Sequence, residues 1–381
     1  MKKKKILFVM DTMVLGGSQK VLLNCLALFK NKYDVELLLL NNYGIYLSDI
    51  PEYINVKFIF SKYKQVPLNE INKFSNLEKF KILFYKFFFR GGIYLSYLKF
   101  KSNHIIKKDD YHYIIGFQEG PSNFVAANIK TNAVKIGWLH SDINRLTKVQ
   151  TKMECGVYEK LNHIICVSDF VKNEAINKYP EIASKIRVLY NPIDTDIIHE
   201  RACEPLLGID KKKINLISIG RLSPEKNFLS LIENLHCYLL ANPNVILNIV
   251  GDGPEKSAII SKIEDKGVSS QVVLHGYQKN PYKYLFNSDI YVSASEYEGL
   301  PTTILEAMIL GKRIIANRIP SNVELLENYP LALLINIKDK VELQYSIYNA
   351  LALEGGGDIT DINMRISCDK FVDNFELAVK N

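Results

Sequence analysis

The sequence predicts an α/β protein built from two doubly wound parallel sheets. The chain has 381 residues, which is long for one domain and sufficient for two. Its hydrophobic content of 48% and charged content of 23% are typical of a globular protein with extensive cores. Short apolar runs alternate with longer helical stretches, and this pattern occurs twice, on either side of the segment "NPIDTD" at 191–196. The Asn-Pro pair and the two Asp residues of that segment indicate a linker.

The first half of the chain has the pattern expected of a parallel sheet covered by helices on both faces. Its first apolar run follows the lysines of "MKKKKILFVMD" and is only about five residues long, so we interpret it as a buried strand and not as a signal peptide. A Gly-containing turn and a helix over about 18–30 come next. The predicted strands of this half are 5–10, 34–40, 55–60, 111–117, 133–139, 163–168 and 186–190.

After the linker the same pattern begins again. A helix is predicted over about 227–241, and the predicted strands are 214–220, 245–251, 271–276, 289–295 and 312–317. We therefore expect an N-terminal domain over 1–192, a C-terminal domain over 193–365, and a final helix over 366–381 that packs back on the N-terminal domain. Ligands of doubly wound sheets bind beyond the carboxyl ends of the strands, so we expect a binding cleft between the two domains.

The composition argues against several kinds of site. The six cysteines are scattered, and the sequence has no CxxC pair and no His/Cys cluster, so neither a disulfide framework nor a zinc site is expected. This use of cysteine is typical of a reducing cytoplasm. No stretch approaches the roughly 20 apolar residues that a membrane-spanning helix needs.

One segment concentrates the positive charge of the chain, whose net charge is +7. Residues 79–108 contain eight basic residues and no acidic one, interleaved with Phe, Tyr and Leu. Basic residues mixed with aromatic ones predict a surface that binds an anionic membrane. The alternative is a core helix whose lysines face water. Nucleic-acid binding is disfavoured, because the rest of the chain is close to neutral and has no recognition motif.

The segment "SASEYEGLPTTILEAM" contains two glutamates, Glu298 and Glu306, eight positions apart. On one straight helix their Cα atoms would lie about 12 Å apart along the axis. That is a poor match for the roughly 5–9.5 Å between the carboxyl groups of a glycosidase pair. Pro301 instead favours a helix that begins near 300–302, with Glu298 in the preceding loop and Glu306 in the second turn.

Such a helix start offers both hydrogen-bond donors and acceptors. The free N–H groups of Thr302 and Thr303 form an anion site. The two carboxylates beside it can accept hydrogen bonds from sugar hydroxyls, so the segment suits a nucleotide sugar. The alternative is an ordinary capped helix with surface acids.

Two turns after predicted strands carry further candidates. "GRLSPEKNF" places Arg221 and Lys226 around a turn at the carboxyl end of a strand. A guanidinium and a flexible ammonium there suit a diphosphate, and solvated surface cations are the alternative. "DTMVLGGSQK" places Gly16 and Gly17 between the first strand and its helix, where glycine lets a ligand approach the backbone. This pair is not the GxGxxG fingerprint, so dinucleotide binding is disfavoured.

Polar side chains also follow two strands of the first half. "IGWLHSD" places His140 directly after a predicted strand, with Asp142 two residues further on. Glu119 of "FQEGPSN" lies at a comparable strand end. Side chains at the carboxyl ends of strands are well placed to contact substrate. A structural histidine is the alternative for His140.

Together these motifs resemble those of the large retaining glycosyltransferase family 4, which has the GT-B fold. The resemblance extends over nearly the whole chain and is strongest from about 214 to 320, where "SEYEGLPTTILEAM" is highly specific to the family. It implies two Rossmann-like domains that face each other across a cleft. The other segments that carry it are "GRLSPEK", "VGDGPE" at 250–255, "NPID" at 191–194 and the GG turn.

The resemblance implies a role for each candidate. Glu298 would hold hydroxyls of the donor sugar, and Glu306 would hold the ribose. Arg221 and Lys226 would neutralise the diphosphate, and His140 matches the family's histidine near the reacting sugar. The family commonly has Gly-Gly-Ala-Glu where this chain has Gly-Gly-Ser-Gln, so no acid is available there. The remaining donor-binding candidates are Gly16, Gly17, Gly299, Leu300, Pro301, Thr302 and Thr303.

By this resemblance the chain is a hexosyltransferase that moves a sugar from a nucleoside-diphosphate sugar to a glycan, with uridine favoured over guanosine as the base. The cations and the helix start can stabilise the leaving diphosphate, so neither a metal ion nor another cofactor is expected. Retention is expected for the family. Because no enzymic nucleophile is evident, front-face attack by the acceptor is our hypothesis. A GT-B sugar-nucleotide epimerase and a non-catalytic GT-B partner protein are the alternatives.

The basic aromatic segment 79–108 then suggests the acceptor. A lipid-linked glycan would bring the N-terminal domain to an anionic membrane surface. We therefore expect a cytoplasmic enzyme that associates peripherally with the inner face of the cell membrane. Its expected process is the assembly of a bacterial surface polysaccharide, such as a capsule or lipopolysaccharide, and no nucleic-acid partner is expected.

Overall fold

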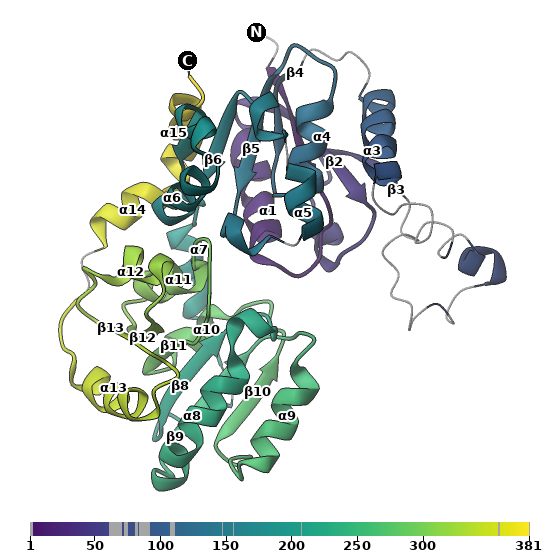
Figure 1. The fold of residues 1–381 in the computed structure, drawn as a ribbon. Coiled ribbons are helices and arrows are strands. Elements are labelled where there is room, and N and C mark those ends of the chain that lie inside the picture. The colour runs from purple at the N-terminus through teal and green to yellow at the C-terminus, as the bar shows by residue number, and fades with distance from the viewer. Residues whose placement is uncertain are drawn as a thin grey trace. The chain divides into compact units, whose positions relative to one another are not determined.

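The computed structural model divides into two compact units, which are coloured along the chain in Figure 1. Unit 1 comprises Met1–Pro192 and Cys368–Asn381, and unit 2 comprises Ile193–Ser367. No helix among the described residues is long and apolar enough to cross a membrane. The structure describes residues 3–60, 71, 75–80, 83, 92–106, 111–146, 148–154, 156–206, 208–356 and 359–380.

Within the described residues, unit 1 contains a parallel sheet of seven strands in the order β3-β2-β1-β4-β5-β6-β7. The chain runs outward in one direction from β1 and in the other direction from β4, which defines a doubly wound sheet. The strands are β1 Lys4–Met10, β2 Tyr33–Asn41, β3 Asn55–Phe60, β4 Tyr111–Gly116, β5 Val134–Leu139, β6 His163–Cys166 and β7 Ile186–Val188.

Helices cover both faces of this sheet. Leu7 and Val9 of β1 join a core with α3, α4 and α5, whereas Phe8 points to the opposite face and meets Phe29 of α1 at 5.4 Å between ring centroids. The helices of unit 1 are α1 Gly17–Lys30, α3 Gly92–Ile105, α4 Pro121–Asn128, α5 Lys148–Glu154, α6 Asp169–Lys178 and α15 Cys368–Ala378, with short 3-10 helices η1 Ile45–Asp49, η4 Ile143–Arg145, η5 Tyr158–Lys160 and η6 Pro180–Lys185.

The last helix of the chain, α15, packs in unit 1. Phe371 and Phe375 are buried, and their rings lie 6.0 and 4.9 Å from that of Phe29. An ion pair adds to this contact: the Nζ of Lys32, just after α1, lies 2.7 Å from a carboxylate oxygen of Glu376 on α15. The final helix therefore completes the core on the α1 face of the sheet.

Unit 2 has the same topology. Its described residues form a parallel sheet of six strands in the order β10-β9-β8-β11-β12-β13. The strands are β8 Ile214–Ile219, β9 Val245–Val250, β10 Val272–Gly276, β11 Ile290–Ser293, β12 Arg313–Asn317 and β13 Ala332–Ile335. The helices are α7 Thr195–Ala202, α8 Phe228–Ala241, α9 Lys256–Asp265, α10 Tyr282–Phe286, α11 Thr302–Ile309, α12 Pro320–Leu326, α13 Lys340–Ala352 and α14 Thr360–Ile366, with the 3-10 helix η7 Pro224–Lys226.

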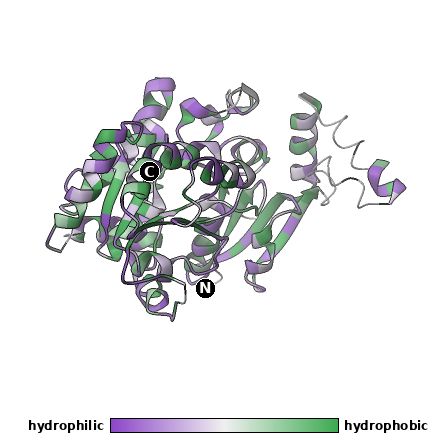
Figure 2. Ribbon diagram, turned by 90° about the horizontal axis from the view of Figure 1, so that it is seen from below, coloured by the Kyte–Doolittle hydropathy of each residue, from purple (hydrophilic) through white to green (hydrophobic). Residues whose placement is uncertain are grey.

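Amphipathic spacing explains why these helices pack as they do. In α8, Leu231, Ile232, Leu235 and Leu239 repeat at three- and four-residue intervals and are all buried. They share one core with α9, α13 and the strands of unit 2. Figure 2 shows the strands as mostly hydrophobic, as expected for parallel sheets that are covered on both faces.

The predicted class, an α/β protein with two doubly wound sheets, is confirmed. The prediction missed β13, because its four-residue apolar run cannot be distinguished by pattern from a short buried helix.

Much of the basic aromatic segment 79–108 lies outside the described residues. Its longest described part is α3, which buries Tyr94 and Leu98 in the core of unit 1. On the outer face of α3, Ile93 is 62% exposed and Phe100 is 70% exposed. The described part is therefore a helix packed in the core that also presents apolar side chains to solvent.

Candidate functional site

In unit 2, two loops meet at the carboxyl edge of the sheet. β8 and β11 are neighbours there, and the chain runs outward from them in opposite directions. Ligands of doubly wound sheets bind at this kind of switch point. The loop after β8 carries Arg221 and Lys226, and the loop after β11 carries Glu298. The N–H of Glu296 donates to the carbonyl of Glu225 at 2.9 Å and joins the two loops.

Glycines shape the loop that carries Arg221. The N–H of Leu222 donates to the carbonyl of Asp252 at 3.0 Å, so this loop runs beside the one after β9. Gly251 has a φ of 154°, and a Cβ there would lie 1.8 Å from the carbonyl oxygen of Gly220. Only glycine permits this close approach. The "VGDGPE" motif thus supports the β8 loop, on which Arg221 is exposed.

Lys226 and Glu298 form an ion pair. The Nζ of Lys226 contacts Oε1 of Glu298, and the same oxygen accepts a hydrogen bond from Oγ of Ser295 at 2.7 Å. The two charged side chains are 23% and 17% exposed. Asn227, with a left-handed φ of 58°, turns the chain from η7 into α8 immediately after the lysine. The sequence motifs singled out both charged residues but did not predict that they pair.

Helix α11 begins at Thr302, directly after Pro301 and close to its predicted start. The N–H groups of Ile304 and Leu305 donate to the carbonyl of Pro301, whereas those of Thr302 and Thr303, the first two of the helix, have no backbone acceptor among the described residues. Glu306 lies in the second turn and is 8% exposed. Its Oε1 accepts a hydrogen bond from the hydroxyl of Tyr282 at 3.2 Å.

Tyr291 of β11 lies near both glutamates. Its side chain is buried, and its hydroxyl lies close to the side chains of Thr303 and Ser293. Burial raises the pKa of Tyr291 well above its usual range, and the charges of Glu298 and Glu306 raise it further. The charges of both carboxylates of the motif therefore act on one buried phenol.

In unit 1 the corresponding switch point lies between β1 and β4. Gly16 and Gly17 follow β1, and α1 begins at Gly17. A Cβ on Gly16 would lie 2.4 Å from Oε1 of the buried Gln19, so this glycine makes room for the glutamine amide. A Cβ on Gly17 would have no neighbouring atom within 4 Å. Of the two glycines, Gly17 therefore has open space beside its backbone.

His140 follows β5, one strand further from the switch point. Its ring packs on those of Phe117 and Trp138, with centroids 4.9 and 6.3 Å away. Burial lowers the pKa of His140 to about 3, against a smaller opposing effect of the Phe117 backbone, so the imidazole is neutral at physiological pH. Its Nε2 is buried and has no hydrogen-bond partner among the described residues. Asp142 instead caps η4 by accepting a hydrogen bond from the N–H of Asn144 at 2.8 Å.

The described ranges contain no group of three or more His, Cys, Asp or Glu side chains that could hold a metal ion. Cys25 and Cys166 are buried and free, and burial raises the pKa of each thiol.

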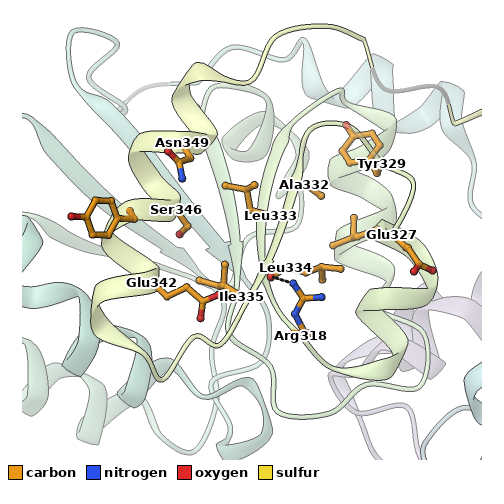
Figure 3. A pocket seen from close by; sticks show the side chains of 12 residues that line it. Arg318, Glu327, Tyr329, Ala332, Leu333, Leu334, Ile335, Glu342, Ser346 and Asn349 are labelled. Atoms are coloured by element: carbon orange, nitrogen blue, oxygen red, sulfur yellow. Dashed lines mark hydrogen bonds between the residues drawn. The ribbon is translucent and has the colours of Figure 1, made fainter.

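A pocket of about 470 Å³ lies elsewhere in unit 2, between α12, α13 and the edge strand β13 (Figure 3). Arg318 reaches into it and donates a hydrogen bond from Nη2 to the carbonyl of Leu334 at 2.6 Å. The guanidinium thus covers part of the free edge of β13, which discourages pairing with another strand. None of the predicted site residues lines this pocket.

Two family profiles match the chain and together span most of it. "Glycosyltransferase Family 4" matches residues 52–197, and "Glycosyl transferases group 1" matches residues 204–357. The chain belongs to glycosyltransferase family 4. The resemblance of the sequence motifs to this family is thereby confirmed, and the protein is a glycosyltransferase.

Curated relatives of this glycosyltransferase act in polysaccharide and lipopolysaccharide assembly. One is "N-acetylgalactosamine-N,N'-diacetylbacillosaminyl-diphospho-undecaprenol 4-alpha-N-acetylgalactosaminyltransferase" of Campylobacter jejuni, 24% identical over 85% of this chain and 84% of the relative. Another is "UDP-Gal:alpha-D-GlcNAc-diphosphoundecaprenol alpha-1,3-galactosyltransferase" of Escherichia coli, 27% identical over 56% of this chain and 57% of the relative.

Solved structures show the same fold. HepE of Anabaena, in complex with UDP and glucose, superposes with a TM-score of 0.75 at 16% identity, covering 99% of each chain. TarM superposes with a TM-score of 0.70 at 16% identity, covering 100% of this glycosyltransferase and 99% of that chain. The GT-B class, with two Rossmann-like domains, is therefore confirmed.

Sequence reasoning missed the side chains that support the site. Ser295 lies three residues before Glu298 in the same loop after β11, so its contact was open to inference. Tyr282 comes from α10, and no periodicity or spacing connects it with Glu306. Such partners become visible only when the fold places separate elements together.

Proposed function

We propose that this glycosyltransferase moves a sugar, with retention of configuration, from a UDP-sugar to a lipid-linked glycan of a bacterial surface polysaccharide. The observation that carries the proposal is the convergence of Lys226, Glu298, Glu306 and the start of α11 at the switch point of unit 2. The names of the two relatives support the donor and the acceptor of this proposal, since one names UDP-Gal and both name undecaprenol-linked acceptors.

Each charged group has a role in binding the donor. The ammonium of Lys226 and the exposed guanidinium of Arg221 bind the diphosphate, together with the free N–H groups at the start of α11. When the diphosphate binds the ammonium of Lys226 in place of Glu298, the carboxylate of Glu298 becomes available to a sugar hydroxyl. Glu306, held by Tyr282, accepts hydrogen bonds from the ribose.

The same groups assist departure of the nucleotide. Negative charge builds up on the diphosphate as the bond to the sugar breaks, and fixed cations and N–H dipoles stabilise that charge. These groups supply the positive charge that a divalent metal supplies in other transferases, so we propose a metal-independent reaction without a cofactor. Activity should then persist in excess EDTA, and a loss that added Mg²⁺ or Mn²⁺ restores would contradict this part.

Retention follows from front-face attack. The acceptor hydroxyl forms its bond to the anomeric carbon on the side from which the diphosphate leaves, and its proton passes to the departing phosphate oxygen. No side chain of the chain becomes bonded to the sugar in this scheme. Trapping of a covalent sugar adduct on the enzyme would contradict it.

We further propose that the enzyme works at the inner face of the cell membrane. The exposed Ile93 and Phe100 of α3, together with the exposed Lys99, give the described part of the basic aromatic segment both apolar and cationic contacts. Co-sedimentation with vesicles that contain anionic phospholipid, and not with neutral ones, is the expected result. A protein that stays in the supernatant with both would contradict the proposal.

Thermal stabilisation by nucleotide sugars tests the donor. A ligand that binds only the folded state at about 100 times its Kd stabilises it by about 2.7 kcal/mol. We expect UDP-sugars, and not GDP- or ADP-sugars, to raise the melting temperature. The rise should be lost in Glu306→Ala and kept in Glu264→Ala, a matched change of an exposed acid on α9.

Three outcomes would count against the proposal. Stabilisation by GDP-sugars alone would correct the base. Interconversion of the UDP-sugar by the enzyme alone would favour an epimerase. No stabilisation by any nucleotide sugar, and no transfer to a diphosphoundecaprenol-linked sugar, would favour a non-catalytic protein.

A further inference from the structure

Glu119 connects the end of one strand with the turn that follows the next. It lies in the loop after β4, which ends at Gly116, and is 3% exposed. Its Oε1 accepts hydrogen bonds from the backbone N–H groups of both His140 and Ser141, the second at 2.6 Å. These two residues follow the last residue of β5, where the strand no longer fixes the backbone. One carboxylate oxygen therefore sets the conformation of the turn that carries the imidazole.

The carboxyl group of Glu119 is buried, and burial of a carboxylate is energetically unfavourable. Burial raises the pKa of Glu119 to about 7, although three backbone N–H groups oppose the rise. A second buried carboxyl, Glu154 of α5, accepts a hydrogen bond from the N–H of Gly120, and its pKa is also raised to about 7, by burial and by the charge of Glu119. Burying a carboxyl group is unfavourable unless hydrogen bonds offset the loss of water. Of the two carboxyls, only Glu119 bonds the turn at His140 and Ser141, so its contact indicates a geometric requirement there.

The strand ends on either side of the turn are themselves fixed. Asn123 of α4 is fully buried, and its Oδ1 accepts a hydrogen bond from the N–H of Trp138 at 3.3 Å. A Cβ on Gly116 of β4 would lie 2.5 Å from this oxygen, and a Cβ on Gly137 of β5 would lie 3.2 Å from it. The two glycines let the amide sit against both strands. Asn123 thus packs against both strands close to their carboxyl ends. Glu119 therefore projects from a backbone that is itself held in place.

We propose that Glu119 is a positioning residue of the transfer reaction, which holds the turn at His140 and Ser141 so that the imidazole meets the substrate in one orientation. The inference rests on the proposed function, because it requires His140 to contact a substrate. The buried Nε2 of His140 has no partner among the described residues, and a substrate hydroxyl would satisfy it. A misplacement of about 1 Å in such a contact lowers the rate by about 100-fold.

Two matched substitutions test the inference. Glu119→Met removes the acceptor with little change of volume, and Glu154→Met does the same to the neighbouring carboxyl, which does not touch the turn. Release of UDP from UDP-galactose, UDP-glucose, UDP-GlcNAc and UDP-GalNAc, with and without a diphosphoundecaprenol-linked sugar, gives kcat and the KM for the donor. We expect Glu119→Met to lower kcat 10- to 100-fold with little change in KM, and Glu154→Met to lower it less than threefold. Glu119→Gln, which keeps an acceptor oxygen, should restore most of kcat.

A double-mutant comparison separates positioning from a general structural role. If Glu119 acts through the imidazole, Glu119→Met adds nothing to the loss caused by His140→Ala. Losses that multiply in the double variant would overturn the inference and leave the proposed function intact. Absence of both UDP release and stabilisation by any UDP-sugar would instead overturn the proposed function and the inference with it.

A spectroscopic measurement does not depend on activity. In protein labelled with ¹⁵N-histidine, Glu119→Met should shift the ring signals of His140, and Glu154→Met should leave them in place. Unchanged signals in Glu119→Met would overturn the inference. Thermal melting confirms that each variant folds, and Glu119→Leu replaces the methionine variant if that one does not.

Discussion

Glu36 is the centre of a buried ion cluster at the amino edge of the sheet of unit 1. Its side chain is 8% exposed, and its two oxygens lie 2.9 Å from Nζ of Lys5 and 2.8 Å from Nζ of Lys57. The hydroxyl of Tyr111 donates a third hydrogen bond at 2.6 Å. Burial alone would raise the pKa of Glu36, but these three partners outweigh it and lower the pKa to about 2. The carboxylate thereby joins β1, β2, β3 and β4.

Glu36→Gln removes this charge and keeps the shape of the side chain. A pKa lowered from 4.5 to about 2 corresponds to ~3 kcal/mol of stability at neutral pH. The two lysine side chains are 26% and 24% exposed and can turn towards water, so we expect a loss of about 2 kcal/mol. Because the pKa is lower in the folded state than in the unfolded state, the stabilisation is present above about pH 4.5 and is lost as the pH falls towards 2.

Urea unfolding followed by tryptophan fluorescence measures this loss. Trp138 is the only tryptophan of the sequence and is buried in unit 1, so its signal reports unfolding of that unit. Asp34→Asn, an exposed acid on the same strand, is the control and should change the free energy of unfolding by less than about 0.5 kcal/mol. Equal stability of Glu36→Gln and the parent protein at pH 7, or a difference that does not narrow between pH 5 and 2.5, would refute the reasoning.

Three further variants test the core and the site. Phe375→Ala should destabilise unit 1 by about 3–5 kcal/mol in the same urea assay, and a loss below about 1 kcal/mol would show that α15 is not part of its core. Gly17→Ala should leave the free energy of unfolding unchanged or raise it by up to about 1 kcal/mol. The same variant should lower turnover at least 10-fold, and full turnover would show that no ligand approaches Gly17. Lys226→Met should weaken binding of UDP by about 10- to 100-fold in titration calorimetry, and an unchanged Kd would remove the lysine from the diphosphate site.

The fold was largely predictable because parallel strands leave a simple pattern. Strands buried on both faces appear as continuous apolar runs, and turns and polar helix faces separate them. Residues 34–40, for example, form one such run and lie within β2, from Tyr33 to Asn41. β13 was missed because four apolar residues carry no period of their own. The contribution of α15 to the core of unit 1 depends on side chains that are more than 200 residues apart, such as Phe29 and Phe375, with a ring separation of 4.9 Å.

The site was predictable only where its residues are close together in the chain. Glu298, Pro301 and Glu306 share one linear motif, so the loop and the helix start could be inferred from proline and spacing. The buried carboxyl of Glu154 could not be inferred, because its contact with Gly120 depends on how α5 packs beside α4. The ion pair of Lys226 with Glu298 likewise depends on the adjacency of β8 and β11. Contacts between elements depend on which strands are neighbours in the sheet. The sequence pattern predicts the fold class but not these individual contacts.

The position of α15 has a consequence for synthesis of the protein. Unit 1 begins before unit 2 in the chain, but Phe371 and Phe375, which fill its core beside Phe29, are synthesised after the whole of unit 2. Unit 2, from Ile193 to Ser367, is complete in the nascent chain before them. The usual order, in which the N-terminal domain folds first, is therefore reversed for the final step. A nascent chain that ends before Phe371 would contain a complete unit 2 and a unit 1 with an open apolar surface, which is a substrate for chaperones and proteases.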